Sequence, residues 1–148
     1  VVGHVQTGEG GLYNAASVLC EGKVAGAYYK RELPAYSIFN EPRYFVPGEQ
    51  ALVFTVKGVR FGVNICEDVW FDRAPRAAAQ AGAQVLLVPN ASPYHIGKAR
   101  EREAALRRCT AVSGCALVYA NQVGGQDELV FDGGSLALDA AGAVAARL

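Results

Sequence analysis

The middle of the chain alternates apolar, strand-like segments with helix-like segments. Residues 59–65, 84–88 and 116–120 are short apolar runs, whereas residues 74–81 and 98–112 have the composition or the 3.6-residue period of helices. Strands of one sheet that are joined by a crossover helix run parallel to each other. The pattern therefore predicts an α/β protein with a partly parallel sheet and helices on at least one face.

Hairpin patterns flank this region and make the predicted sheet mixed. Each pair of apolar segments surrounds a short turn that contains glycine, as antiparallel hairpins do. The predicted hairpins are 12–19 with 23–29, 52–56 with 59–65, and 135–138 with 143–146, and a further strand is predicted at 1–6. Residues 31–50 and 124–128 are predicted to be loops. The first of these is too long for a plain connector, and such loops are usually functional.

The composition excludes several classes of protein. Half of the 148 residues are hydrophobic, which is enough for the core of one domain, and the formal net charge of zero does not suit binding to nucleic acid. No run approaches the roughly 20 apolar residues of a membrane span. The four cysteines lack zinc-site spacing, so we expect no metal site, and so apolar a chain does not suggest a disulfide framework. A cytoplasmic location is predicted.

Cys66 is the candidate nucleophile. It follows an apolar strand pattern and precedes a predicted helix, where rigid backbone would hold it. The acidic neighbours Glu67 and Asp68 would raise its thiol pKa, so an active thiolate needs a cation from elsewhere in the chain. Lys30, between a predicted strand and the long loop, is the candidate cation. The alternatives stay open at this point, because a buried cysteine can be inert and a lysine is commonly solvated.

Several motifs together resemble the nitrilase (carbon-nitrogen hydrolase) superfamily. The resemblance rests on residues 29–34, 44–48, 64–70 and 90–93. Residues 30–36 with 39–41, and residues 127–134, look more narrowly like the glutaminase domains of glutamine-dependent NAD⁺ synthetases. The resemblance implies a nitrilase-like αββα sandwich with mixed sheets. Residues 1–148 would form the central part of this domain, which would be incomplete at both ends.

The resemblance also implies roles for individual residues. Cys66 would be the nucleophile, and Lys30 would stabilise the thiolate and the oxyanion. Glu41 matches a supporting carboxylate near the lysine, while the family's general-base glutamate would lie before Val1. The implied substrate-binding residues are Tyr36, Phe39, Glu67, Ser92 and Lys98.

The implied function is hydrolysis of the glutamine amide, with the ammonia used to amidate deamido-NAD⁺. No cofactor is expected in this domain, and ATP and Mg²⁺ are expected only in an absent synthetase domain. Glutamine, that synthetase domain and further copies of the same chain in a homo-oligomer are the expected partners. Two alternatives stay open: a free-standing amidase or carbamoylase, and an inactive fragment that lacks the third catalytic residue.

Overall fold

The computed structural model describes residues 1–148 and contains three sheets and two α-helices. The helices are α1 (Arg73–Gln80) and α2 (Lys98–Ser113), with 3₁₀ turns η1 (Glu41–Arg43) and η2 (Cys66–Trp70). The strands are β1 (Val2–Gly8), β2 (Gly11–Cys20), β3 (Lys23–Tyr29), β4 (Val53–Val56), β5 (Val59–Val63), β6 (Val85–Asn90), β7 (Ala116–Asn121), β8 (Val123–Gln126), β9 (Leu129–Asp132), β10 (Leu136–Leu138) and β11 (Val144–Arg147). Neither helix has the length and apolar character of a transmembrane segment.

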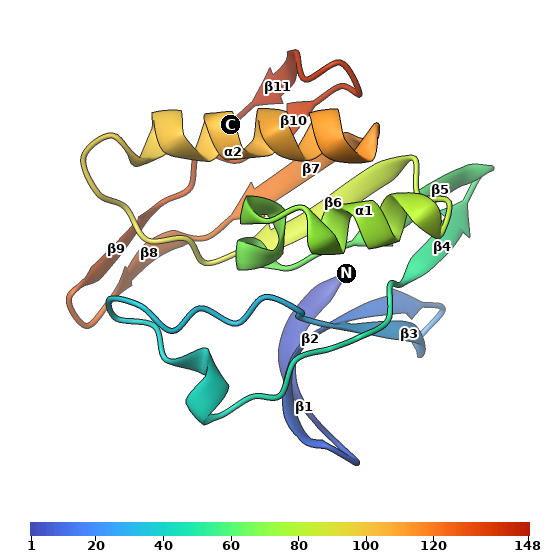
Figure 1. Ribbon diagram of the computed structural model, residues 1–148, viewed down its shortest axis with the longest axis horizontal. Coiled ribbons are helices and arrows are strands. Elements are labelled where there is room, and N and C mark those ends of the chain that lie inside the picture. The colour runs from blue at the N-terminus through green and yellow to red at the C-terminus, as the bar shows by residue number, and fades with distance from the viewer.

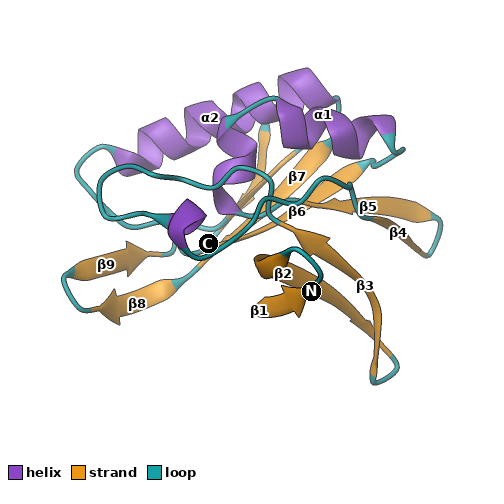
Figure 2. Cartoon of the chain, turned by 60° about the horizontal axis from the view of Figure 1, so that its bottom comes forward, coloured by secondary structure: helices purple, strands orange, loops and turns teal.

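The larger sheet has six strands in the order β11-β10-β7-β6-β5-β4. Strands β5, β6 and β7 are parallel and are joined by α1 and α2, whereas the other pairs are antiparallel. The predicted mixed sheet is thereby confirmed. Both helices lie on one face of this sheet, and the antiparallel sheet β1-β2-β3 lies on its other side (Figures 1 and 2).

Two apolar cores hold these layers together. The larger core joins the helices to the sheet and includes Ala78, Leu86, Leu106 and Leu117, all nearly inaccessible to solvent. The smaller core lies between the two sheets and consists of Ala16, Val18, Tyr28, Val63 and Ile65. Three residues of the smaller core lie close in sequence to the candidates: Tyr28 is two residues before Lys30, and Val63 and Ile65 shortly precede Cys66. The inter-sheet core therefore determines where both functional candidates lie.

The predicted hairpins form, whereas one predicted loop and the end of one predicted strand differ from the structure. Residues 124–128, predicted as a loop, belong to the hairpin of β8 and β9. Strand β8 is glycine-rich and fully exposed, so neither the apolar pattern nor strand propensity marked it. The strand predicted at 59–65 ends at Val63, because Asn64 and Ile65 lead into a 3₁₀ turn that begins at Cys66.

Candidate functional site

Cys66 occupies an unusual backbone conformation at the start of η2. Its φ of 45° lies in the left-handed region, which is uncommon for residues other than glycine. Such a conformation persists only when the surrounding structure imposes it. Here the turn is closed from both sides, since Asp68 N donates to Ile65 O (3.0 Å) and Ile65 N donates to Asp68 Oδ2 (2.8 Å). The sulfur is therefore presented from a fixed turn.

Lys30 follows β3 and is more deeply buried than Lys98, the other lysine of the site. Its side chain is only 2% exposed, and Nζ donates to Glu41 Oε1 over 2.6 Å. The far end of the long loop returns to this point, where Gly48 N donates to Lys30 O (2.8 Å). A Cβ on Gly48 would lie 2.2 Å from Tyr29 O, so only glycine allows so close an approach. The loop thus encloses the Lys30–Glu41 ion pair.

Two adjoining clefts meet at Cys66. The Lys30 cleft has a volume of about 800 Å³ and is lined by Lys30 and Glu41. The Lys98 cleft, of about 360 Å³, is lined by Tyr36, Ser92 and Lys98. The residues that line both clefts are Phe39, Cys66 and Glu67. All eight residues predicted from the sequence are therefore brought to one region, with Cys66 at its centre.

The electrostatics of Cys66 follow the expectation from its neighbours. Burial raises the pKa of the Cys66 thiol, and the nearby Lys30 ammonium opposes that effect. The carboxylates Glu67, Glu41 and Asp68 raise the pKa further. A thiolate at this position is consequently favoured by Lys30 and disfavoured by every other charged neighbour named here.

Aromatic residues and Glu67 form the wall between the clefts. Tyr36 Oη donates to Glu67 Oε1 (2.8 Å), and the Tyr36 ring meets Phe39 edge-to-face at 6.2 Å. Glu67 is only 8% exposed. Burial, followed by the hydrogen bond to Glu67, raises the pKa of Tyr36. The pair thus places a carboxylate beside the sulfur and holds it in one orientation.

Lys98 begins α2 and lies over the ring of Trp70, which was not among the residues predicted for the site. Its ammonium is 4.3 Å from the centroid of Trp70 and 4.0 Å from Glu101 Oε2. A cation is disfavoured at a helix N-terminus, and here the ring and the carboxylate both attract it. Its position four residues after the candidate nucleophile was the one sequence feature that could have indicated Trp70 as a residue of the site.

Ser92 is held by two polar side chains, Asn121 and Arg102, neither of which was predicted from the sequence. Asn121 Oδ1 accepts from Ser92 N (2.9 Å), and Arg102 Nη2 donates to Ser92 O (3.4 Å). Arg102 is 2% exposed and forms an ion pair with Asp132 (3.0 Å). Arg102 is buried on α2 together with Ala105 and Leu106, and the helical period alone does not distinguish a buried arginine from a solvated one.

The remaining polar residues of the region do not form a second catalytic or metal-binding site. His4 lines the Lys30 cleft and shares a 2.7 Å hydrogen bond with Ser17 Oγ. No group of three or more His, Cys, Asp or Glu side chains is gathered as a metal site would need. The four cysteines are free thiols.

Known proteins resemble this chain in sequence and in fold over nearly its whole length. The carbon-nitrogen hydrolase family matches residues 1–148. The glutamine-dependent NAD⁺ synthetase of Xanthomonas campestris pv. campestris is 53% identical over 146 residues, which are 97% of this chain and 26% of that enzyme. The structure of the glutamine-dependent NAD⁺ synthetase of Acinetobacter baumannii, in complex with ADP, matches with a TM-score of 0.93 and 41% identity, covering 99% of this chain and 28% of that one.

A third similar structure is an amidase of Nesterenkonia sp. AN1. A variant of it carries the acetamide moiety of fluoroacetamide covalently added to its active-site cysteine, and it matches with a TM-score of 0.80 and 35% identity over 93% of this chain and 51% of that one. The chain spans about a quarter of the length of the synthetases, as the 26% coverage shows. Since the family match extends over residues 1–148 and the fold agrees, the chain belongs to the carbon-nitrogen hydrolase family.

Proposed function

We propose that the chain is the central part of a nitrilase-like glutaminase domain, built as an αββα sandwich. It hydrolyses the side-chain amide of glutamine and supplies ammonia for the ATP-dependent amidation of deamido-NAD⁺ to NAD⁺ by a synthetase domain. The 53% identity with one such synthetase and the TM-score of 0.93 with another support this proposal. ATP and Mg²⁺ belong to the synthetase domain.

In the proposed reaction the Cys66 thiolate attacks the amide carbon of glutamine. A carbon–sulfur bond forms while the carbonyl π electrons move to oxygen, and protonation of the nitrogen then allows ammonia to leave a thioester. Water hydrolyses that thioester to glutamate and restores the thiol. Each tetrahedral intermediate carries an oxyanion, which the Lys30 ammonium and a backbone N–H after Cys66 stabilise. The proton transfers require a carboxylate, which the family resemblance assigns to a glutamate outside residues 1–148.

Glutamine recognition is proposed to take place in the Lys98 cleft. The substrate's α-ammonium needs an acid and its α-carboxylate needs donors, so Glu67 meets the first and Ser92 with Lys98 meets the second. Tyr36 and Phe39 enclose the aliphatic part of the side chain. The amide then points toward Cys66, because the two clefts meet there.

One observation carries the proposal. Cys66 is held with a φ of 45° where the Lys30 cleft and the Lys98 cleft join, and the ammonium of Lys30 is kept in the first of them by Glu41. A buried lysine beside a fixed cysteine suits stabilisation of negative charge on sulfur and oxygen. The proposed location is the cytoplasm, and assembly as a homo-oligomer is proposed from the family resemblance.

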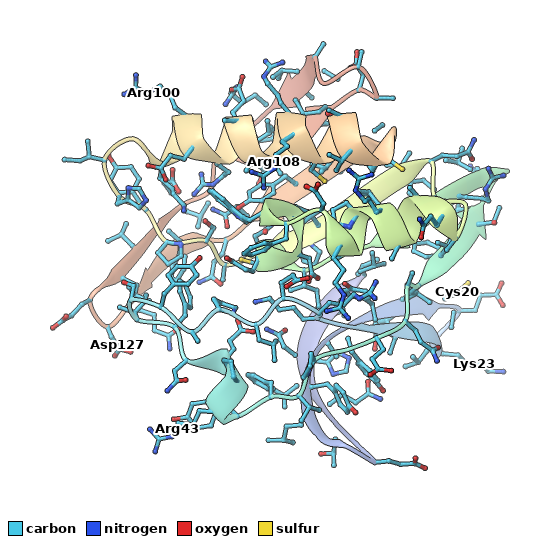
Figure 3. All side chains as sticks on the ribbon, in the orientation of Figure 1. Cys20, Lys23, Arg43, Arg100, Arg108 and Asp127 are labelled. Atoms are coloured by element: carbon cyan, nitrogen blue, oxygen red, sulfur yellow. The ribbon has the colours of Figure 1, made fainter.

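The test uses the complete protein with Cys66→Ala. Glutamine-driven synthesis of NAD⁺ should be lost, whereas synthesis driven by added ammonia should persist because free ammonia does not need the thiol. Cys20→Ala is the matched control, since Cys20 is exposed and lies at the β2–β3 turn, away from both clefts (Figure 3). Glutamine-driven turnover by Cys66→Ala would contradict the proposal.

The amidase from Nesterenkonia favours a second candidate, a free-standing amidase. The two functions differ in what the Lys98 cleft binds. A glutaminase requires the α-carboxylate, so Ser92→Ala should raise KM for glutamine with a smaller change in kcat. Hydrolysis of simple amides at a rate that Ser92→Ala leaves unchanged, without hydrolysis of glutamine, would instead identify an amidase.

A further inference from the structure

Asp68 is a buried carboxylate that the proposed chemistry does not use. It is 0% exposed, and it lies two residues after Cys66 in η2. A carboxylate in such a place is costly unless hydrogen bonds compensate for its lost hydration. A buried acid at this position must therefore be compensated by its hydrogen-bond partners.

Four donors converge on the two oxygens of Asp68. Oδ1 accepts from Arg31 N (3.1 Å) and Glu32 N (2.9 Å), and Oδ2 accepts from Ile65 N (2.8 Å) and Tyr28 Oη (2.8 Å). An ionised carboxylate is an acceptor only, with about four lone-pair sites. All of these sites are used, and every partner is a donor.

These hydrogen-bond partners of Asp68 are close in sequence to Lys30 or to Cys66, the two proposed catalytic residues. Tyr28 and Arg31 lie two residues before and one residue after Lys30, and Ile65 directly precedes Cys66. The Lys30 segment follows β3 of the smaller sheet, whereas the Cys66 turn follows β5 of the larger sheet. One carboxylate thus links the two segments across the inter-sheet core.

We propose that Asp68 is a positioning residue that fixes the Cys66 turn relative to Lys30. The inference rests on the proposed function, since it assigns Asp68 to the same reaction. Asp68 does not touch the substrate. Its two oxygens hold the backbone that follows Lys30, the hydroxyl of Tyr28 and the backbone in front of Cys66, so that ammonium and sulfur meet in one geometry.

The test substitutes Asp68→Asn in the complete protein. The asparagine amide has the shape of the carboxylate, but its NH₂ group would face two of the four donors and cannot accept their hydrogen bonds. The connection between the Lys30 segment and the Cys66 turn is therefore broken on one side. We expect kcat for glutamine hydrolysis to fall about 100-fold, the loss typical of a misplaced reacting group, with less than about a threefold change in KM. Asp72→Asn is the matched control, because Asp72 belongs to the same segment, is 49% exposed and should leave both constants unchanged.

A second readout separates positioning from general stabilisation. The rate at which iodoacetamide alkylates Cys66 should fall in Lys30→Gln. It should also fall in Asp68→Asn, although removal of the Asp68 charge by itself favours the thiolate. If Asp68 acts through Lys30, the double variant should be no slower than Lys30→Gln. Independent, multiplicative effects of the two substitutions would overturn the inference.

Tyr28→Phe keeps the inference testable if Asp68→Asn does not fold. It removes one of the four donors and should lower kcat about threefold to tenfold at unchanged KM; wild-type kcat would overturn the inference. Failure of the proposed function has a different signature. Turnover by Cys66→Ala removes the proposed function, whereas loss of turnover in Cys66→Ala together with wild-type kcat in Asp68→Asn removes only the role of Asp68.

Discussion

Lys30 shows how a single buried charge can be maintained in this fold. Its side chain is only 2% exposed, and Glu41 at 2.6 Å is its ion-pair partner. Removing one member of a buried pair typically costs about 3–5 kcal/mol, because the remaining charge is left without compensation. The pair is therefore a structural requirement, and its lysine is the cation that we propose for Cys66.

Lys30→Arg should not replace lysine, although the charge is kept. A planar guanidinium is larger and distributes its charge, so it cannot occupy the same place beside Glu41 and the sulfur. We expect kcat for glutamine hydrolysis to fall at least about 100-fold, as when a donor to the oxyanion is lost. Lys23→Arg is the control, since Lys23 is exposed at the tip of the β2–β3 hairpin (Figure 3). Equal activity of Lys30→Arg and wild type would contradict the role.

Burial raises the pKa of Asp68 to about 6 from its ordinary value of 3.8, and the backbone hydrogen bonds oppose this. A folded-state pKa above the unfolded one means that the folded protein binds this proton more tightly. The resulting stabilisation is complete below the unfolded pKa and is lost as the pH rises through about 6. The free energy of unfolding of the wild type, relative to Asp68→Asn, should fall by about 2 kcal/mol between pH 4 and pH 7. Denaturant unfolding at each pH measures it, and a difference that rises with pH would contradict the assignment.

At the scale of elements, Arg102 joins α2 to two other parts of the site. It forms an ion pair with Asp132 on β9 and donates to Ser92 O in the segment after β6. The hydrogen bond to Arg102 lowers the pKa of Asp132. The helix, the β8–β9 hairpin and the segment after β6 thus share one buried guanidinium.

Arg102→Met should lower the free energy of unfolding by about 1.5–3 kcal/mol, because it removes the charge-assisted hydrogen bonds from the buried guanidinium to Asp132 and Ser92 O. KM for glutamine should rise as well, since Ser92 loses one of its two anchors. Arg100→Met on the same helix is the control, as Arg100 points into solvent (Figure 3), and its effect should stay within about 0.5 kcal/mol. Equal stability of the two variants would contradict the role of Arg102.

The elements also show what sequence patterns could and could not predict. Apolar runs predicted β5, β6 and β7 with their helices, because buried parallel strands are continuously apolar. Glycine-containing turns predicted the hairpins, and the turn residues Glu21 and Lys57 adopt the positive φ that such turns need. The β8–β9 hairpin escaped prediction, since its order depends on contacts such as Arg102–Asp132 and not on its own composition.

For the whole molecule, the candidate site depends on segments that the sequence does not relate to one another. Cys66 and Lys30 were recognisable from local context and from the family resemblance. The four-way coordination of Asp68 and the contact of Lys98 with Trp70 required the packing of distant segments, with 36 to 40 residues separating Asp68 from its partners on the Lys30 side. Such networks arise from the meeting of two sheets and a helix, so no single motif encodes them.

The 148-residue chain on its own should associate with further copies of itself. Strand β1 lies at an edge of the smaller sheet, and its Val2 and Val5 side chains are 51% and 59% exposed. An apolar edge strand with unpaired backbone groups pairs readily with other chains. Light scattering coupled to size-exclusion chromatography should show mass rising with concentration, and Val5→Lys should reduce that rise because a charge opposes edge pairing. A monomeric mass at every concentration would show that this edge is protected within the 148 residues.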